Sequence, residues 1–202
     1  MKLHGTSVLL LALAVAVCAP AGASTLYSNG PINGTINAWN TCCGFAVTDS
    51  FTISSNSTVT GFDGGFWLGS GDTPVQVDWA IGTSAFGNDK GSGTSALSNV
   101  FFETNGFGYD IYTSTASGLS VALGPGTYWL TLQNGITAQS SNLFWDENDG
   151  PSMAQQTFTG PIGSEAFNIY GTGSTTPEPG TIVMFASGVL GLGSVICRKL
   201  ML

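Results

Sequence analysis

The stretch LSVALGPGTYWLTL, residues 119–132, indicates the fold of this protein most directly. Apolar residues occupy every second position on each side of Gly124-Pro125-Gly126. A period of two places alternate side chains on opposite faces of a β-strand, whereas a helix would need a period of 3.6. Glycine and proline between the two runs favour a turn. The stretch therefore predicts a β-hairpin of two half-buried strands.

The same alternation recurs outward from this stretch. In residues 75–81, Val75, Val77, Trp79 and Ile81 would form one apolar face, opposite the polar positions 76 and 78. Weaker runs of the same kind are separated by turn signals such as Asn-Gly and Asp-Gly. No helical periodicity of comparable length appears between the two ends of the chain. We therefore predict an all-β domain of eight to ten short strands, arranged as an antiparallel β-sandwich or jelly roll.

Length and charge limit what this domain can bind. We expect the folded domain to span residues 24–170 of the 202, followed by a flexible linker at 171–176. Between residues 24 and 176 there are eleven acidic residues and one base, Lys90, which gives a net charge of −10. Phosphate binding needs clustered lysine and arginine, so nucleic-acid binding is excluded.

The N-terminal residues 1–23 are typical of a secretory signal peptide. Lys2 precedes an apolar run, and Ala21-Gly22-Ala23 supplies the small-x-small pattern that signal peptidase accepts before Ser24. Cys18 raises the alternative of a lipoprotein, but Val17 stands where a lipid-attachment site would need a small residue. We expect cleavage between Ala23 and Ser24, and hence export.

The C-terminal residues 177–202 have three parts in a fixed order. Pro177-Glu178-Pro179-Gly180 is followed by the apolar stretch 181–197 and then by Arg198-Lys199. As a helix, the apolar stretch would be about 25 Å long, slightly short of a hydrocarbon core of about 30 Å. The basic pair can reach the cytoplasmic headgroups and orient the helix. The order predicts a transmembrane helix that anchors an outward-facing domain.

This ordered set resembles the PEP-CTERM sorting signal of bacterial surface proteins. The resemblance rests on Pro177-Glu178-Pro179-Gly180, the glycine-rich core Gly188-Val189-Leu190-Gly191-Leu192-Gly193 and Arg198-Lys199. It implies a cell-surface or extracellular-matrix location and an exosortase-type processing enzyme as a partner. Proteins with this signal often accompany exopolysaccharide production, so an extracellular polysaccharide is a further expected partner.

Missing residues restrict catalysis. The only histidine, His4, lies in the signal peptide, so the mature domain can have no Ser-His or Cys-His pair. Two carboxylates from the set Asp146, Glu147 and Asp149 could still serve a glycosidase. The alternative interpretation is that these are solvated loop acids.

The same acidic segment contains the candidate calcium ligands, Asp146 and Asp149, although its spacing does not match an EF-hand loop. Asp63 and Asp72 form a second candidate pair for calcium. No other metal or cofactor is expected.

Cys42 and Cys43 are adjacent and have no other cysteine partner in the domain. Consecutive Cα atoms are about 3.8 Å apart, below the usual span of a disulfide. A vicinal bridge, an intermolecular link and buried free thiols all remain open.

Two tryptophans are candidates for contacting a glycan. Trp129 is out of phase with the apolar positions of its strand, and Trp67 is out of phase with Phe66 and Leu68. An exposed ring beside hydroxyls and amides is what stacking against a sugar requires, while the other interpretation is that a loop covers these rings. We expect a non-catalytic surface protein that has a structural role or binds polysaccharide or other matrix components. The alternative is an exported carbohydrate-active enzyme using carboxylates near Asp146–Asp149.

Overall fold

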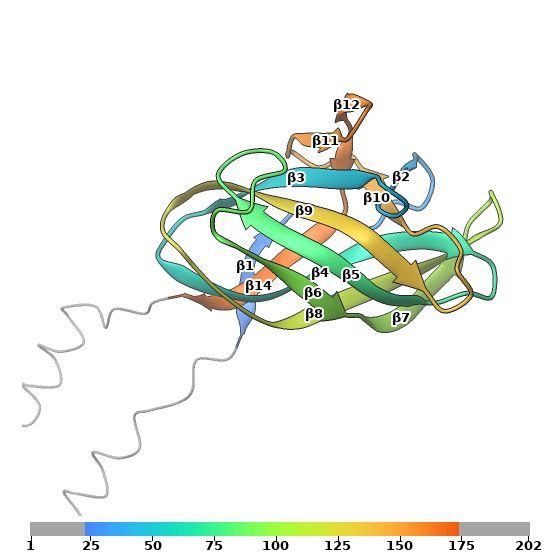
Figure 1. The fold of residues 1–202 in the computed structure, drawn as a ribbon, viewed down its shortest axis with the longest axis horizontal. Coiled ribbons are helices and arrows are strands. Elements are labelled where there is room, and N and C mark those ends of the chain that lie inside the picture. The colour runs from blue at the N-terminus through green and yellow to red at the C-terminus, as the bar shows by residue number, and fades with distance from the viewer. Residues whose placement is uncertain (1–22, 174–202) are drawn as a thin grey trace, which may run out of the picture.

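The computed structural model describes residues 23–173, and within them the protein is all-β (Figure 1). The predicted signal peptide, apart from Ala23, and the predicted sorting tail lie outside these residues. Within the described part of the chain, no helix is long and apolar enough to span a bilayer.

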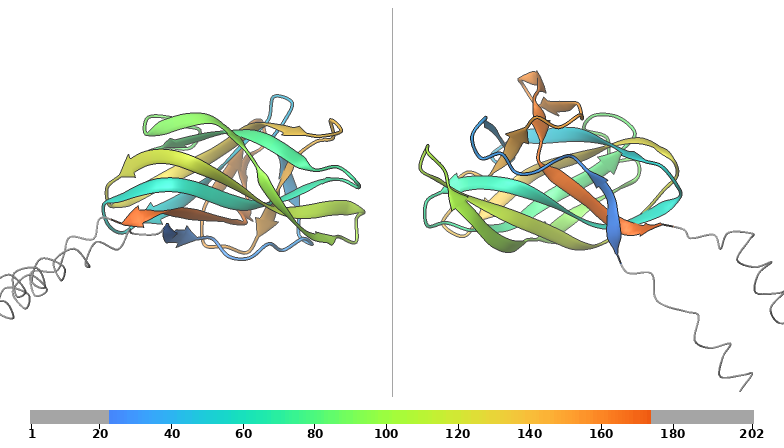
Figure 2. Two further views of the ribbon diagram at one scale, coloured as in Figure 1. Left: turned by 90° about the horizontal axis from the view of Figure 1, so that it is seen from below. Right: turned by 180° about the vertical axis from the view of Figure 1, so that it is seen from behind.

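Two antiparallel sheets pack face to face as a sandwich, which confirms the predicted fold class (Figures 1 and 2). The first sheet contains eight strands: β1 (Ser24–Ser28), β2 (Ala38–Asn40), β4 (Ser57–Gly69), β7 (Ser98–Thr104), β8 (Tyr109–Leu123), β10 (Phe144–Asn148), β13 (Ser164–Glu165) and β14 (Phe167–Gly173). The second contains six, in the order β12 (Gly160–Ile162), β11 (Ala154–Gln156), β3 (Ala46–Ile53), β9 (Gly126–Thr137), β5 (Pro74–Gly82) and β6 (Gly91–Ala96).

The first sheet is organised around β4, a strand of 13 residues. On one side β4 pairs with β8, and on the other it pairs with β14 and then with β10. The second sheet is organised around β9, which pairs with β3 on one side and β5 on the other.

The predicted hairpin at residues 119–132 is wrong, although both of its strands exist. β8 belongs to the first sheet and β9 to the second, so Gly124-Pro125 joins the two layers. Leu119, Val121 and Leu123 of β8 are buried, as are the alternate apolar residues of β9. Because both apolar faces point into the same core, the strands belong to opposite layers rather than to one sheet.

The core between the sheets contains the side chains that the alternation predicted, with one exception. Val77, Trp79 and Ile81 of β5 are buried, whereas Val75 is 41% exposed. The pairing of β5 with β9 shifts register between Pro74 and Gln76 and again between Gln76 and Asp78, so the alternation is interrupted there and Pro74 is buried instead. The shortest strands, β2, β11, β12 and β13, have two or three residues and are too short to show a period, which is why fewer strands were expected.

Both ends of the domain lie at the same place. Ser24 in β1 pairs with Gly171 in β14, and the view from behind shows these strands side by side (Figure 2). The last strand continues to Gly173, because residues 171–173 pair with β4, so three residues of the predicted linker are part of the sheet.

Candidate functional site

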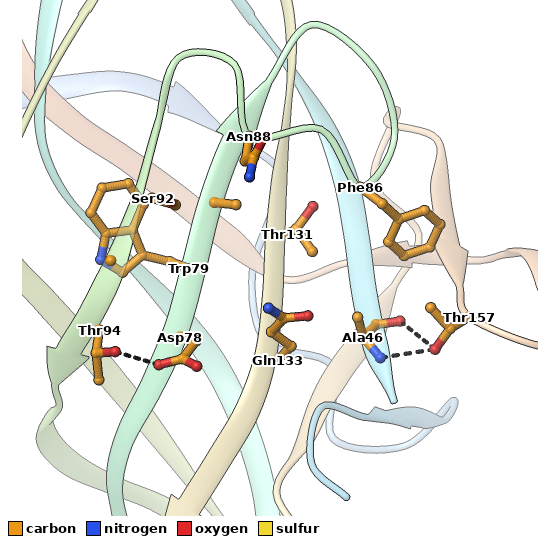
Figure 3. Close-up of a pocket in the computed structure, with 12 residues that line it drawn as sticks. Ala46, Asp78, Trp79, Phe86, Asn88, Ser92, Thr94, Thr131, Gln133 and Thr157 are labelled. Carbon is orange, nitrogen blue, oxygen red and sulfur yellow. Dashed lines mark hydrogen bonds between the residues drawn. The ribbon is translucent and has the colours of Figure 1, made fainter. Parts of the chain in front are cut away.

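The outer face of the second sheet carries a polar groove that crosses four of its strands and ends at a residue that follows a fifth (Figure 3). Its volume is about 390 Å³. It runs from β6 across β5 and β9 to β3 and to the residue that follows β11. The lining residues are Ala46, Asp78, Trp79, Ala80, Phe86, Asn88, Ser92, Gly93, Thr94, Thr131, Gln133 and Thr157.

Strand alternation explains why polar side chains gather here. Along β9, Leu130 and Leu132 point into the core, so Thr131 and Gln133 must point outward. Along β5, the inward positions flank Asp78 in the same way. Neighbouring strands of the sheet therefore present their polar positions on one surface.

The Asp78 carboxylate is the one acidic group that lines the groove. Thr94 Oγ1 donates to its Oδ1 at 2.5 Å, and Asn134 Nδ2 donates to its Oδ2 at 2.8 Å. These bonds fix the orientation of the carboxylate and leave further lone pairs open to the groove.

Other polar groups of the groove are free to meet a ligand. Figure 3 marks hydrogen bonds among the lining residues only for Thr94 with Asp78 and for Ala46 with Thr157. The side chains of Asn88, Ser92 and Gln133 thus make no bond to another lining residue. An amide or hydroxyl can both donate and accept, so this set suits a ligand with many hydroxyl groups.

An exposed aromatic ring stands at one end of the groove. Phe86 is 38% exposed and lies in the loop between β5 and β6 with a φ of +59°. The Phe86 amide donates to Thr48 Oγ1 at 3.5 Å, and Thr131 Oγ1 donates to the same oxygen at 2.9 Å. The loop is therefore tied down onto the outer face of the sheet.

Trp79 is also a lining residue, but its indole belongs to the core and packs on the inner side of β6. Its Nε1 donates to Ser95 Oγ at 3.0 Å. A Cβ at Gly93 would lie 3.2 Å from the ring, so the glycine allows the ring to approach the backbone of β6 closely.

The two tryptophans predicted to contact a glycan have different environments. The expectation that Trp67 is exposed is wrong: it is 5% exposed, and its Nε1 donates to Asp146 Oδ1 at 2.6 Å. Trp129 is half-buried and lies on β9 out of phase with the core, as predicted, but it does not line the groove. The sequence reasoning missed Phe86, because a single phenylalanine in a loop carries no periodic signal.

The predicted acidic site around Asp146 is a structural element. Asp146 is fully buried, and its carboxylate accepts bonds from the amides of Asn33 at 2.7 Å and Gly34 at 2.9 Å, in addition to Trp67. Glu147 points to the other face of β10, as strand geometry predicted, and accepts a bond from Trp39 Nε1 at 2.6 Å. The interpretation of Asp146 as a solvated loop acid is wrong, and the residue is out of reach of a substrate.

The calcium candidates are likewise not brought together. Both oxygens of Asp146 accept N–H bonds, while Asp149 is exposed in the loop after β10. Among residues 23–173, no group of three or more histidine, cysteine or acidic side chains is placed to hold a metal ion.

Cys42 and Cys43 form a vicinal disulfide, with Cα atoms 3.8 Å apart. Of the three states considered from the sequence, the structure thus has the intramolecular bridge. Cys43 has a φ of +62°, which turns the chain sharply between β2 and β3.

Three fully buried carboxyl groups come from three strands: Asp49 of β3, Asp146 of β10 and Glu165 of β13. Asp49 accepts bonds from the amides of Ser50 and Glu165, at 2.6 and 2.7 Å, yet burial raises its pKa to about 6. Glu165 is fully buried, and neither carboxyl oxygen has a hydrogen-bond partner. Burial, reinforced by the negative charges of Asp49, Glu147 and Asp146, raises the pKa of Glu165 well above its usual value. A buried carboxyl without a hydrogen-bond partner is costly to ionise, so the fold favours the protonated, neutral form of Glu165.

Removing the Asp146 carboxylate will destabilise the domain. Asp146→Ala leaves three N–H groups without their acceptor, and we expect a loss of roughly 3 kcal/mol in the free energy of unfolding. The matched control, Asp149→Ala, removes an exposed carboxylate three positions away and should change that free energy by no more than about 0.5 kcal/mol. Urea denaturation followed by tryptophan fluorescence measures both. Equal stability of the two variants would contradict the role given to Asp146.

The buried carboxyls will make the domain more stable in mild acid than at neutral pH. A raised folded-state pKa means that stability is fully present below the unfolded-state pKa and declines as pH rises toward the folded-state value. For Asp49, that window lies between the ordinary aspartate pKa of 3.8 and about 6, and for Glu165 it begins near the ordinary glutamate pKa of 4.5 and extends higher. Glu165→Gln should make the decline between pH 4.5 and 7 shallower.

Denaturation curves at several pH values test this expectation. The control Glu103→Gln removes one exposed carboxylate, so it accounts for the general repulsion among acidic groups. A decline that Glu165→Gln and Glu103→Gln alter equally would contradict the assignment of the proton to Glu165.

Comparison with known families bears on the tail rather than on the groove. Residues 175–199 match the model of the PEP-CTERM protein-sorting motif, which confirms the resemblance found in the sequence. The motif implies an exported, envelope-associated protein that is sorted by exosortase. A search of the curated proteins finds no match to the chain.

Proposed function

We propose that this exported protein is a non-catalytic module that binds extracellular polysaccharide through the groove on its second sheet. The single observation that supports this most is the composition of the groove: unpaired amides and hydroxyls beside an exposed phenylalanine, on an open surface that crosses the strands.

A sugar has C–H bonds that can pack on an aromatic ring and hydroxyl groups that can bond to amides, and this surface offers both kinds of partner. The face of an aromatic ring carries partial negative charge and attracts the polarised C–H bonds of a sugar ring. Phe86 supplies such a face. Amides such as those of Asn88 and Gln133 can then exchange hydrogen bonds with the sugar hydroxyls in either direction.

The negative charge of the domain favours a neutral polysaccharide over an anionic one as the ligand. The groove carries the Asp78 carboxylate and no basic side chain, and the domain around it has a net charge of −10. A polyanionic polymer would be repelled at physiological ionic strength. The ligand we propose is therefore a neutral polysaccharide.

Hydrolysis is a less supported alternative. A glycosidase of the usual kind needs two carboxyl groups on either side of the scissile bond. Asp78 is the one carboxylate of the groove. Of the acids at 146–149 that suggested an enzyme, Asp149 lines a separate cavity without the other two, since Asp146 is fully buried and Glu147 is bonded to Trp39.

The position of the chain ends supports display at a membrane. Cleavage between Ala23 and Ser24 would leave a domain that begins at β1, and a helix at 181–197 would anchor it through β14. Since β1 and β14 are neighbours, anchoring at that end leaves the outer face of the second sheet open to the matrix.

Affinity electrophoresis of the purified protein in native gels that contain laminarin, galactomannan, hydroxyethylcellulose or alginate tests the proposal. We expect at least one neutral polymer to retard the wild-type protein and alginate not to do so. Phe86→Ala and Gln133→Ala should weaken that binding by about tenfold each, equivalent to about 1.4 kcal/mol.

The matched control is Phe102→Ala, which removes a phenylalanine that is 50% exposed on the other sheet. Binding that depends on Phe102 and not on Phe86 would move the site to β7. Retardation by none of the three neutral polymers would reject the proposed function.

A further inference from the structure

Phe158 is the most exposed large apolar side chain among residues 23–173, at 90%. It stands at the tip of the turn between β11 and β12, where Gln156 pairs with Gly160. Its ring packs edge-on against Phe45, with centroids 5.8 Å apart and an interplanar angle of 87°. The tip of this turn therefore presents the Phe158 ring to solvent, and Phe45, which precedes β3, supports that ring from one side.

The local structure gives no stabilising reason for phenylalanine at this position. Phe158 has a φ of +70°, in the left-handed region that glycine and asparagine adopt at little cost and that other residues adopt rarely. Its exposed ring also recovers little hydrophobic free energy. Neither the backbone conformation of Phe158 nor the exposure of its ring stabilises the folded domain. This combination suggests that the ring serves in binding rather than in stability.

Phe86 shares both properties. Its φ is +59°, and its ring is partly exposed at the end of the groove where Thr157 also lies (Figure 3). Among residues 23–173, five residues other than glycine have a positive φ, and both phenylalanines in this set belong to this region of the second sheet.

Phe45 and Phe158 are each next in sequence to a residue that lines this same end of the groove. Ala46 and Thr157 both line the groove and are joined by hydrogen bonds of 2.9 and 3.0 Å. Phe45 precedes the first of these residues and Phe158 follows the second. The aromatic pair therefore adjoins the groove where the groove reaches β3.

We infer that Phe158, supported by Phe45, forms a second aromatic subsite beyond Thr157, so that the ligand is a linear polysaccharide lying across the strands. The inference rests on the proposed function and extends it. From β5, which carries Asp78, to β11 the path crosses three interstrand spacings, about 14 Å in all. A single sugar ring is shorter than this distance, and only a chain of several sugars contacts both Asp78 and Phe158.

The test compares a polymer with its fragments. The probes are whichever of laminarin, galactomannan and hydroxyethylcellulose the wild-type protein binds, together with the disaccharide and hexasaccharide of the same repeating sugar. Phe158→Asn should weaken binding of the polymer and the hexasaccharide at least fivefold and leave the disaccharide unchanged. Phe86→Ala should weaken all three.

Two further variants keep the result interpretable. Phe158→Tyr retains the ring and should bind as the wild type does, while Phe107→Ala removes a ring that is 65% exposed in the turn between β7 and β8 and should have no effect. Because asparagine suits a positive φ, the melting temperature of Phe158→Asn should be equal to or higher than that of the wild type.

The outcomes separate this inference from the proposed function. Wild-type affinity of Phe158→Asn for the polymer, with binding weakened in Phe86→Ala, would overturn the second subsite and leave the groove in place. Equal weakening of disaccharide and hexasaccharide by Phe158→Asn would place Phe158 in a short site and overturn the polymer arrangement. Absence of binding by the wild-type protein would reject both.

Discussion

Burial of one face of each sheet is the constraint on which the rest of this structure depends. Strands of alternating character have to point their apolar side chains into the shared core, where Leu130 and Leu132 of β9 face strands of the opposite layer. The outward positions are then fixed by geometry rather than by their own interactions. Thr131 and Gln133 thus point to the same side of the sheet as Asp78 of the neighbouring strand, where Gln133 is exposed and Thr131 is covered by the loop that carries Phe86. The groove is a consequence of the same alternation that makes the core.

Polar groups in the interior have a different role from those in the groove. Asp146 ties the segment at Asn33 and Gly34 to β10 and, through Trp67, to β4. Glu165 has no such partner and is compatible with the core only as a neutral acid. The acidic composition of the domain therefore has two origins, since some carboxyls are structural and the others give the surface a negative charge that would repel polyanions.

The sequence predicted the fold class and the sorting tail, because both rest on periodic or ordered patterns. Alternation identified β5 and the two strands around Gly124, and the ordered tail matched its family model. Alternation cannot say which strands share a sheet, so the hairpin was wrongly predicted. It also cannot show that a segment such as Asn33-Gly34 covers an outward face, which is why Trp67 and Asp146 were expected at the surface. Phe86 and Phe158 depend on loop conformation, which leaves no repeating signal.

The central claim is that the outer face of the second sheet is where this exported domain meets its matrix. Amide chemical shifts in ¹⁵N-labelled protein, titrated with a hexasaccharide of the polymer that the protein binds, test it residue by residue. The account predicts perturbations at Asp78, Phe86 and Gln133, with none at outward positions of the first sheet such as Thr113. Perturbations confined to the first sheet, with the groove residues unmoved, would contradict it.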